Sequence, residues 1–139
     1  MKIKRSAVKS IAFPFFLQLY LFIAEKLLPL QTERKENMKT ELILKQIQPQ
    51  DTVVLLDERG RELRSIELAA WLEQKRHTAR RLVFVIGGPY GFSSAVYTRA
   101  NEMLSLSRLT FSHQMVRLVF TEQIYRACTI IKGEPYHHE

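Results

Sequence analysis

The sequence predicts an α/β fold with a parallel sheet, and two short apolar runs carry that prediction. Residues 52–57 and 82–86 are nearly continuous in apolar side chains, which is typical of strands buried on both faces of a sheet. A predicted helix at 65–76 follows the first run, and predicted helices to about Met103 and at 113–131 follow the second. Strands that alternate with helices are typical of parallel sheets. A length of 139 residues suggests one domain spanning 1–139.

The first half of the chain contains two further predicted helices. Residues 15–29 are strongly apolar, and residues 38–48 have a moderate apolar stripe. The strand that follows should end where residues 58–60 make a turn. Ser65 is a candidate N-cap for the next helix, which should run to Arg76, because its hydroxyl can accept a hydrogen bond from an unpaired backbone amide.

The second strand runs directly into a glycine-rich turn at residues 87–91. Ser93 or Ser94 should then cap a helix that extends to about Met103. Residues 105–111 alternate between apolar and polar side chains, which indicates a short strand or an extended loop. These segments place three strand ends, and therefore a ligand-binding crevice, at one edge of the sheet.

The long helix at 113–131 has an apolar face of period 3.6. Gly133 is a suitable residue just past its C-terminus, and Pro135 prevents its continuation. Within the helix, Glu122 and Arg126 are four residues apart and can form an ion pair.

The composition limits the function classes. The formal net charge of +7 and the sequence pI of about 9.8 favour an anionic partner, either a nucleic acid or a membrane surface. The single cysteine, Cys128, excludes an internal disulfide framework and a cysteine-rich zinc site. That cysteine count is compatible with a reducing cytosol.

The N-terminus has features of a secretory signal, because basic residues precede an apolar run at residues 11–24. Pro14 and Gln18 interrupt that run, and Glu25 and Lys26 close it without a small-residue cleavage site. The run is also shorter than the roughly 20 apolar residues of a membrane-spanning helix. We therefore expect a buried or dimer-facing helix rather than an exported or anchored segment.

The glycine turn has two interpretations. Residues 87–91 do not match the dinucleotide fingerprint or the Walker phosphate loop, and a glycine-rich turn after a strand is most often only a tight turn. The functional interpretation is a pocket edge at which an adenosine group meets the backbone. Residues 104–111 are likewise either an amphipathic edge strand or a second pocket wall.

The charged segments also have a structural and a functional interpretation. Basic residues cluster at 59–64 and again at 75–81, as either a solvated face or a surface that contacts phosphates. In the C-terminal tail, His137 and His138 lack the spacing of a zinc site, so we expect no metal. They are suited to acid–base chemistry or to RNA contact, unless the tail is simply a free terminus.

The sequence resembles the RlmH family, which are SPOUT-class methyltransferases that modify N3 of a pseudouridine in 23S ribosomal RNA. The resemblance covers roughly residues 40–139. Four ordered stretches carry it: VFVIGGPYG at 83–91, LSRLTFSHQMVR at 106–117, EQIYRA at 122–127 and YHHE at 136–139.

The resemblance implies properties that the strand pattern alone does not give. The fold would contain a C-terminal trefoil knot, and the protein would act as a cytoplasmic homodimer on the ribosome. The knot would bind S-adenosylmethionine as methyl donor. Carried over by position, the donor-binding residues would be Leu56, Gly87, Leu106, Ser107, Arg108, Leu109, Thr110 and Phe111.

Methylation at N3 requires that position to lose a proton, so the resemblance also implies a base or a stabilising cation. His137, His138 and His113 are the candidate bases. Arg126 and Arg117 are the candidate cations. The tail would complete the site only with RNA and the second subunit in place.

One region departs from the family pattern. Family members begin with a strand that leads into a Val-Gly-Lys-like turn, whereas residues 7–10 contain no glycine, and all of 1–39 is shorter and more apolar than usual. Two other hypotheses therefore stand beside the enzyme. One is a ribosome-binding module that has lost catalysis, and the other is a protein attached to a membrane through residues 11–24.

Overall fold

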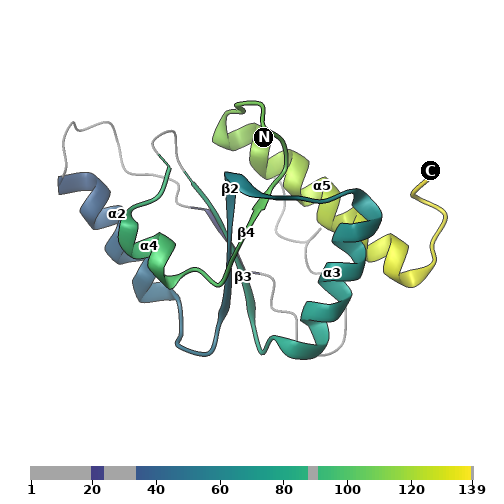
Figure 1. The fold of residues 1–139 in the computed structure, drawn as a ribbon, viewed down its shortest axis with the longest axis horizontal. Helices are drawn as coiled ribbons and strands as arrows, with labels where there is room; N and C mark the ends of the chain where they lie inside the picture. Colours follow the sequence, from purple (N-terminus) through teal and green to yellow (C-terminus); the bar gives the residue numbers. More distant parts are fainter. Residues whose placement is uncertain (1–19, 24–33, 88–90, 139) are drawn as a thin grey trace, which may run out of the picture.

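The computed structural model describes residues 20–23, 34–87 and 91–138, and these confirm the α/β fold. Helices lie on both faces of a central sheet: α2 (Arg34–Gln46) and α4 (Ser94–Arg99) on one, α3 (Ser65–Thr78) and α5 (His113–Lys132) on the other (Figure 1). The strands in the described residues are β1 (Tyr20–Ile23), β2 (Thr52–Glu62), β3 (Leu82–Ile86) and β4 (Glu102–Ser105).

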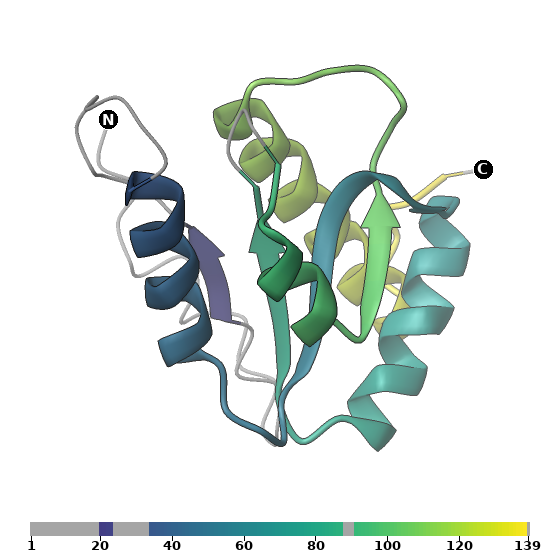
Figure 2. The ribbon, with the colours of Figure 1, turned by 60° about the vertical axis from the view of Figure 1, so that its left-hand side comes forward.

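The sheet has the strand order β1-β3-β2-β4, and every neighbouring pair is parallel. The carboxyl ends of β2, β3 and β4 therefore meet at one edge, over which the connection from β4 to α5 arches (Figure 2). This edge is where ligands bind in open parallel sheets, which makes it the part of the fold that positions a site.

Alternating residues of the central strands build two separate cores, because successive side chains in a strand point to opposite faces. On one face, Val53, Leu55, Val83 and Val85 pack against Ile43 of α2 and Val96 of α4. β3 and residues 53–56 of β2 are buried on both faces, as their composition predicted, whereas β2 beyond Leu56 is partly or fully exposed.

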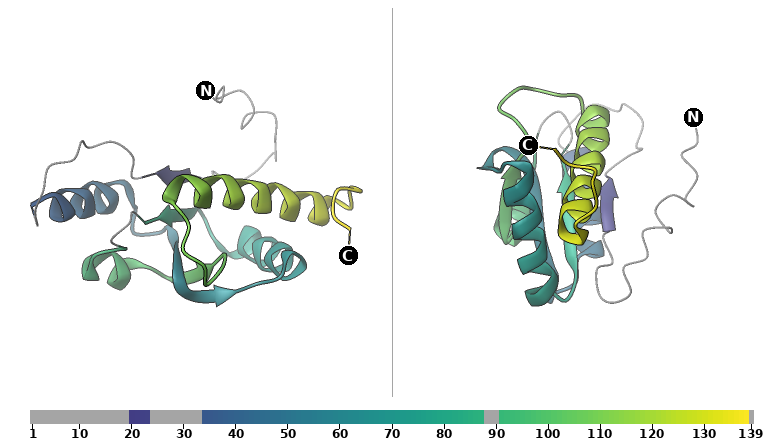
Figure 3. Two further views of the ribbon diagram at one scale, coloured as in Figure 1. Left: turned by 90° about the horizontal axis from the view of Figure 1, so that it is seen from above. Right: turned by 90° about the vertical axis from the view of Figure 1, so that its right-hand side faces the viewer.

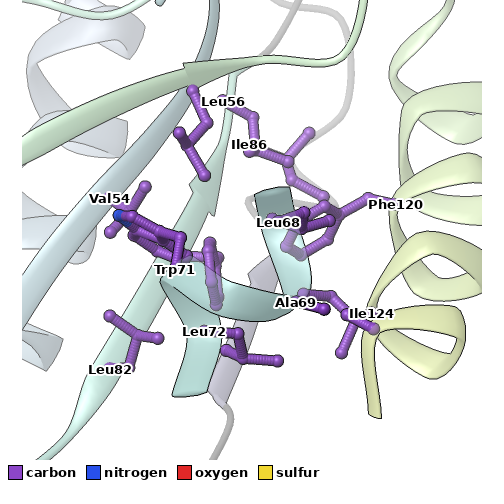
Figure 4. Close-up of a cluster of buried hydrophobic side chains, with 13 residues drawn as sticks. Val54, Leu56, Leu68, Ala69, Trp71, Leu72, Leu82, Ile86, Phe120 and Ile124 are labelled. Carbon is purple, nitrogen blue, oxygen red and sulfur yellow. The ribbon is translucent and has the colours of Figure 1, made fainter. Parts of the chain in front are cut away.

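The larger core lies between the sheet and the helices α3 and α5 (Figure 4). Phe84 of β3 lies at its centre, with its ring centroid 4.8 Å from that of Phe120 and 6.0 Å from that of Trp71. Phe84 and Phe120 are almost completely buried. This packing fixes the position of α5 relative to the sheet.

The predicted turn at residues 58–60 is wrong, because β2 continues through it to Glu62. The strand contains a bulge: Leu56 and Arg61 are both paired with Leu104 of β4, and the residues between them arch out of the ladder. Gly60 allows this close approach, since a Cβ on it would lie only 2.5 Å from the backbone carbonyl carbon of Leu104. Bulges of this kind re-aim side chains beside active sites.

The helix predicted at 15–29 is also wrong where the structure describes it. Residues Tyr20–Ile23 form β1, which pairs in parallel with β3 along its otherwise open edge. A short apolar run rich in aromatic residues suits a strand as well as a helix, and periodicity alone does not separate the two. Residues 15–19 and 24–29, like the atypical stretch 7–10, lie outside the described residues.

Two helix boundaries differ from the prediction for local reasons. Ser65 does not cap α3; its hydroxyl donates to Gln123 Oε1 on α5 at 2.9 Å, and the Glu67 carboxylate accepts the Arg64 N–H at 2.8 Å instead. The helix predicted after Ser93 or Ser94 begins at Ser94; Ser93 is at the N-cap position, but its side chain makes no capping hydrogen bond. This helix ends at Arg99 rather than at about Met103, because Met103 pairs with β2 as part of β4. Of the two alternatives for residues 105–111, the extended loop is confirmed, because β4 covers Glu102–Ser105 and the chain beyond it is a connection to α5.

The prediction for α5 is confirmed at both ends. The Ser112 hydroxyl accepts the Met115 N–H at 3.3 Å at the start, and Gly133 adopts the left-handed conformation, with φ of 70°, at the end. Within the described residues no helix is both long and apolar enough to cross a membrane. The predicted helix 38–48 is α2, which begins at Arg34 and ends at Gln46.

Candidate functional site

A pocket of about 570 Å³ lies beyond the carboxyl ends of β2, β3 and β4. Three segments form its walls: the bulge after Leu56, the chain on either side of the glycine turn, and the β4–α5 connection. Its volume falls within the roughly 300–1,000 Å³ that is usual for small-molecule sites. Most of the wall is loop, so backbone N–H and C=O groups are available to a ligand.

The structure brings together seven of the eight residues that the family resemblance assigned to the donor. Leu56 and Gly87 lie on this pocket, together with Leu106, Ser107, Leu109, Thr110 and Phe111. Arg108 does not line it; its side chain is directed toward Glu62, with Nε 3.6 Å from Oε1. That these residues bind a methyl donor stays a prediction.

Gly87 keeps the pocket open at the end of β3. A Cβ on this residue would lie 3.1 Å from the Phe92 ring and would narrow the space beside it. Phe92 in turn packs edge-on against Tyr97 of α4, with ring centroids 5.7 Å apart. The backbone of Gly87 is therefore exposed to a ligand, and an aromatic pair limits the pocket on that side.

A network of polar side chains, none of them among the sequence-predicted site residues, lines the same pocket. The Asp57 carboxylate accepts hydrogen bonds from the Tyr97 hydroxyl at 2.5 Å and from the Arg59 backbone N–H at 2.9 Å. The Arg59 guanidinium donates to Asp57 Oδ1 through Nε at 3.2 Å and to the Tyr97 hydroxyl through Nη2. It also stacks on the Tyr97 ring, 4.8 Å from the centroid.

The network holds Asp57 in its ionised form. Burial acts to raise the pKa of this carboxyl group, but the hydrogen bonds from Arg59 and Tyr97 and the charge of Arg59 outweigh it, so the pKa is lowered. The pKa of Tyr97 is raised by its burial and by its hydrogen bond to Asp57. At neutral pH the pocket therefore contains a fixed carboxylate, a neutral phenol and a guanidinium.

Only one residue of this network, Asp57, stands at a position that the sequence marks as a candidate for ligand binding. Asp57 follows directly on a buried strand, at the position where ligand-binding side chains of parallel sheets stand. Arg59 is one of several basic residues at 59–64, and nothing local distinguishes Tyr97 within its short helix. The bond between Asp57 and Tyr97 joins residues 40 positions apart, which only the tertiary structure reveals.

The candidate catalytic residues of the tail form a second cluster, on the C-terminal half of α5. The predicted Glu122–Arg126 ion pair is confirmed, with 3.0 Å between Oε1 and Nε. The Arg126 guanidinium also stacks on the Tyr136 ring at 5.0 Å, and Nη1 lies 3.3 Å from Nδ1 of His137. The tail thus folds back onto the helix beside Arg126.

The contact with Arg126 determines the tautomer of His137. A guanidinium can only donate, so Nδ1 is the acceptor and the proton of the neutral ring is on Nε2. That Nε2 is buried and has no hydrogen-bond partner in the described part of the chain. In this arrangement His137 can donate a hydrogen bond at Nε2, and it would have to leave Arg126 to act as a base through Nδ1.

The remaining candidates are distributed along α5 and the tail. His113 is exposed at the first residue of the helix, near the pocket but not among its lining residues. His138 is exposed in the tail, and Arg117 is partly buried one turn into the helix.

The pocket and the tail cluster lie at opposite ends of α5. Val116 lines the pocket, whereas Arg126 lies ten residues further on, which corresponds to about 15 Å along a helix. Figure 3 shows the tail at the far end of the molecule, beyond the C-terminus of α5. Within one chain, the structure does not bring His137, His138 or Arg126 to the pocket.

A parallel α/β sheet with a nucleoside-sized pocket beyond its carboxyl edge is the arrangement of α/β enzymes that bind nucleotide-like ligands. Comparison with known families makes the class specific, because the model of a family described as predicted SPOUT methyltransferase matches residues 8–137. The chain belongs to the SPOUT methyltransferase family.

Named relatives cover most of the chain. The ribosomal RNA large subunit methyltransferase H of Bacteroides fragilis is 59% identical over 111 residues, which is 79% of this chain and 71% of that protein. The protein of the same name from Parabacteroides distasonis is 60% identical over 110 residues, 78% of this chain and 69% of its own length. The protein of that name from Christiangramia forsetii is 54% identical over 110 residues, which is 78% of this chain and 70% of that protein.

Proposed function

We propose that this protein is a ribosomal RNA methyltransferase that uses S-adenosylmethionine to methylate N3 of a pseudouridine in 23S ribosomal RNA. One observation carries the proposal most directly. In a chain of the SPOUT methyltransferase family, the residues expected to bind the donor, such as Leu56, Gly87 and Leu106, line a single pocket. The names of the relatives supply the class of RNA.

The described residues fit the donor. The pocket is large enough for a nucleoside with an amino-acid side arm, and Gly87 leaves its backbone open to the base. Ser107 and Thr110 add hydroxyl groups, and Leu106 and Phe111 add apolar surface to the same wall. When bound, the donor supplies an electrophilic methyl group on a sulfonium.

The protein must then orient the target nucleotide, exclude water and accept or stabilise the charge left at N3. His137, His138 and His113 remain the candidate bases, and Arg126 and Arg117 the candidate cations. Because Arg126 and His137 are far from the pocket of their own chain, they can serve a pocket only if a second copy supplies them. We infer a homodimer in which each tail reaches the partner's pocket, with the C-terminal segment of each chain knotted as the family implies.

One face of α5 is suited to such a dimer. Met115, Leu118 and Tyr125 share it and leave 47%, 61% and 43% of their surface exposed. Leu109 and Phe111, in the β4–α5 connection that precedes this helix, are also exposed apolar residues. Exposed apolar surface on a helix is typical of an interface.

A cytoplasmic location for the protein follows from the proposed ribosomal substrate.

Isothermal titration with S-adenosylmethionine tests donor binding, with the Gly87→Val variant as the comparison. The branched side chain would fill the space against Phe92, so this variant should fold but lose donor binding. A folded wild-type protein that binds no donor contradicts the proposal. Mass spectrometry of ribosomal RNA from a deletion strain tests the product, and an unchanged level of methylated pseudouridine would instead favour a non-catalytic ribosome-binding module.

Mixed dimers test whether the site is shared between two subunits. Gly87→Val removes the pocket and Arg126→Ala removes the tail cluster, so each homodimer should be inactive. A mixture allowed to exchange subunits should regain activity, because one pocket of each mixed dimer is intact and faces an intact tail. A mixture that stays inactive, although subunit exchange is demonstrated, shows that both groups act within one chain.

A further inference from the structure

We propose that Arg59 binds the α-carboxylate of the methyl donor and thereby selects ligands that carry an intact amino-acid arm. This inference rests on the proposed function, since it takes the pocket beyond β2 and β3 to be the donor site. It assigns a role to a residue that the sequence suggested only as one member of a general basic cluster.

The guanidinium of Arg59 is held in place before any ligand arrives. Asp57 accepts from its Nε at 3.2 Å, the Tyr97 hydroxyl accepts from its Nη2, and the Tyr97 ring lies beneath it at 4.8 Å from the centroid. Asp57 is itself fixed, with only 8% of its side chain exposed. A side chain that is already ordered loses little entropy when it binds, and this makes an arginine an effective anion receptor.

The same contacts leave donors available. A guanidinium has five N–H groups, and the bonds to Asp57 and Tyr97 occupy one on Nε and one on Nη2. The groups on Nη1 and the second N–H of Nη2 have no partner in the described residues. The Arg59 side chain is 65% exposed, so a carboxylate can approach this edge and accept two parallel hydrogen bonds.

The charges around the pocket also favour this assignment. Among the described residues that line it, Arg59 is the one basic side chain. The α-carboxylate is the single anionic group of S-adenosylmethionine, so Arg59 is the group in the pocket that can pair with it. The neighbouring acidic residues Asp57 and Glu58 are suited to the cationic ammonium of the same amino-acid arm.

The backbone is shaped to place Arg59 at this position. Residues 57–60 arch out between the two pairings of β2 with Leu104, and Gly60 makes the close approach to β4 possible. Without the arch, the ladder would continue regularly from Leu56 and successive side chains would alternate between the two faces of the sheet. The bulge instead puts Asp57 and Arg59 on the pocket.

A ligand pair that differs only in the carboxylate provides the test. Isothermal titration of the full chain would compare S-adenosylmethionine with its decarboxylated analogue. The wild type should bind S-adenosylmethionine about tenfold tighter or more, as expected for a charge-assisted hydrogen-bonded pair. Arg59→Gln should lose that preference by weakening the intact donor alone, and Arg59→Lys should keep part of it, because lysine retains the charge without the two-pronged geometry.

Arg61→Gln is the matched control, since Arg61 is an exposed arginine of the same strand that does not line the pocket. It should leave both affinities unchanged, and thermal unfolding by circular dichroism confirms that each variant is folded. If Arg59→Gln weakens both ligands equally, the residue only shapes the pocket and the assignment is overturned. If it weakens neither ligand but weakens binding of an RNA fragment, Arg59 contacts a phosphate and the assignment is likewise overturned.

Different results would overturn the proposed function and the assignment of Arg59. A wild type that binds neither ligand overturns the donor pocket itself, and the role of Arg59 with it. A wild type that binds the two ligands with equal affinity leaves the methyltransferase proposal standing and overturns only the assignment of Arg59.

Discussion

Gly60 is the residue whose missing side chain lets the bulge of β2 approach the backbone of β4. It lies in the bulge of β2 at the point where the strand returns to β4. A Cβ would lie 2.5 Å from the carbonyl carbon and 2.7 Å from the amide nitrogen of Leu104, both of which are backbone atoms. Backbone in a ladder cannot move aside as the end of a flexible side chain can, so the bulge itself would have to change.

We expect Gly60→Ala to lower the free energy of unfolding by about 1–3 kcal/mol and to weaken donor binding, because Asp57 and Arg59 would be displaced from the pocket. Urea denaturation and titration calorimetry measure the two effects. Gly133→Ala is the control: it should cost stability through its left-handed backbone, at φ of 70°, and leave donor binding intact. A Gly60→Ala variant with wild-type stability and affinity contradicts this account of the bulge.

A single carboxylate, that of Asp51, joins the amino-terminal edge of the sheet to α2. The Asp51 side chain is completely buried. It accepts the Gln48 N–H at 2.7 Å and the Arg81 Nε at 2.7 Å, and Arg81 also donates to the Gln46 carbonyl at 3.1 Å. The end of α2 and the starts of β2 and β3 are therefore fixed together by one ion pair.

This ion pair predicts how stability depends on pH. Burial acts to raise the pKa of Asp51, but the hydrogen bonds from Arg81 and Gln48 and nearby positive charge outweigh it, so the folded-state pKa is lowered. The stabilisation is therefore complete above the unfolded-state pKa of about 4 and is lost as the pH falls through the lower, folded value.

Asp51→Asn should accordingly lower the free energy of unfolding by about 2–4 kcal/mol at pH 7, because Arg81 loses its charged partner. The difference from the wild type should shrink as the pH falls below about 4. Urea denaturation at pH 7 and at pH 3 measures it. Glu41→Gln, which affects only an exposed pair with Lys45, should change stability by less than about 1 kcal/mol. An equal effect of Asp51→Asn at both pH values would contradict the linkage.

An aromatic contact anchors helix α5 on the sheet, beside the other buried residues of its apolar face. Phe120 is 1% exposed and packs on Phe84 of β3. Phe120→Ala should lower the free energy of unfolding by about 3–5 kcal/mol, since it leaves a cavity in the larger core. Phe120→Leu should lower the free energy of unfolding by less than Phe120→Ala does, because leucine fills more of the space that the phenylalanine ring occupies. Thermal unfolding ranks the two variants, and equal melting temperatures for Phe120→Ala and the wild type would show that this contact does not hold the helix.

The proposed dimer predicts that the oligomeric state depends on the exposed apolar face of α5. Leu118→Glu places a charge on the exposed apolar face of α5, so it should convert the dimer to a monomer while the fold is kept. Light scattering coupled to size-exclusion chromatography measures the mass. Leu42→Glu is the matched control, since Leu42 is an exposed leucine on α2, on the opposite side of the sheet. A Leu118→Glu protein that remains dimeric places the interface elsewhere.

Local sequence patterns determined the framework of this protein. The apolar runs at 52–57 and 82–86 specified buried strands, and the 3.6-residue period of α5 specified its length and its buried face. Part of the pocket lining could be named in advance, because the carboxyl ends of parallel strands meet at one edge and because the family motifs include Gly87 and the stretch 106–111. Arg108 was named with them but does not line the pocket.

Tertiary structure alone decided the rest, because it depends on pairings between distant residues. Whether Tyr20–Ile23 became a strand depended on the open edge of β3, and the bulge after Leu56 depended on where β4 returned to β2. The bond between Asp57 and Tyr97 has no local signature, since each residue is ordinary in its own segment. The periodicity of apolar residues shows only which neighbours along the chain share a face, so it does not predict contacts between distant segments.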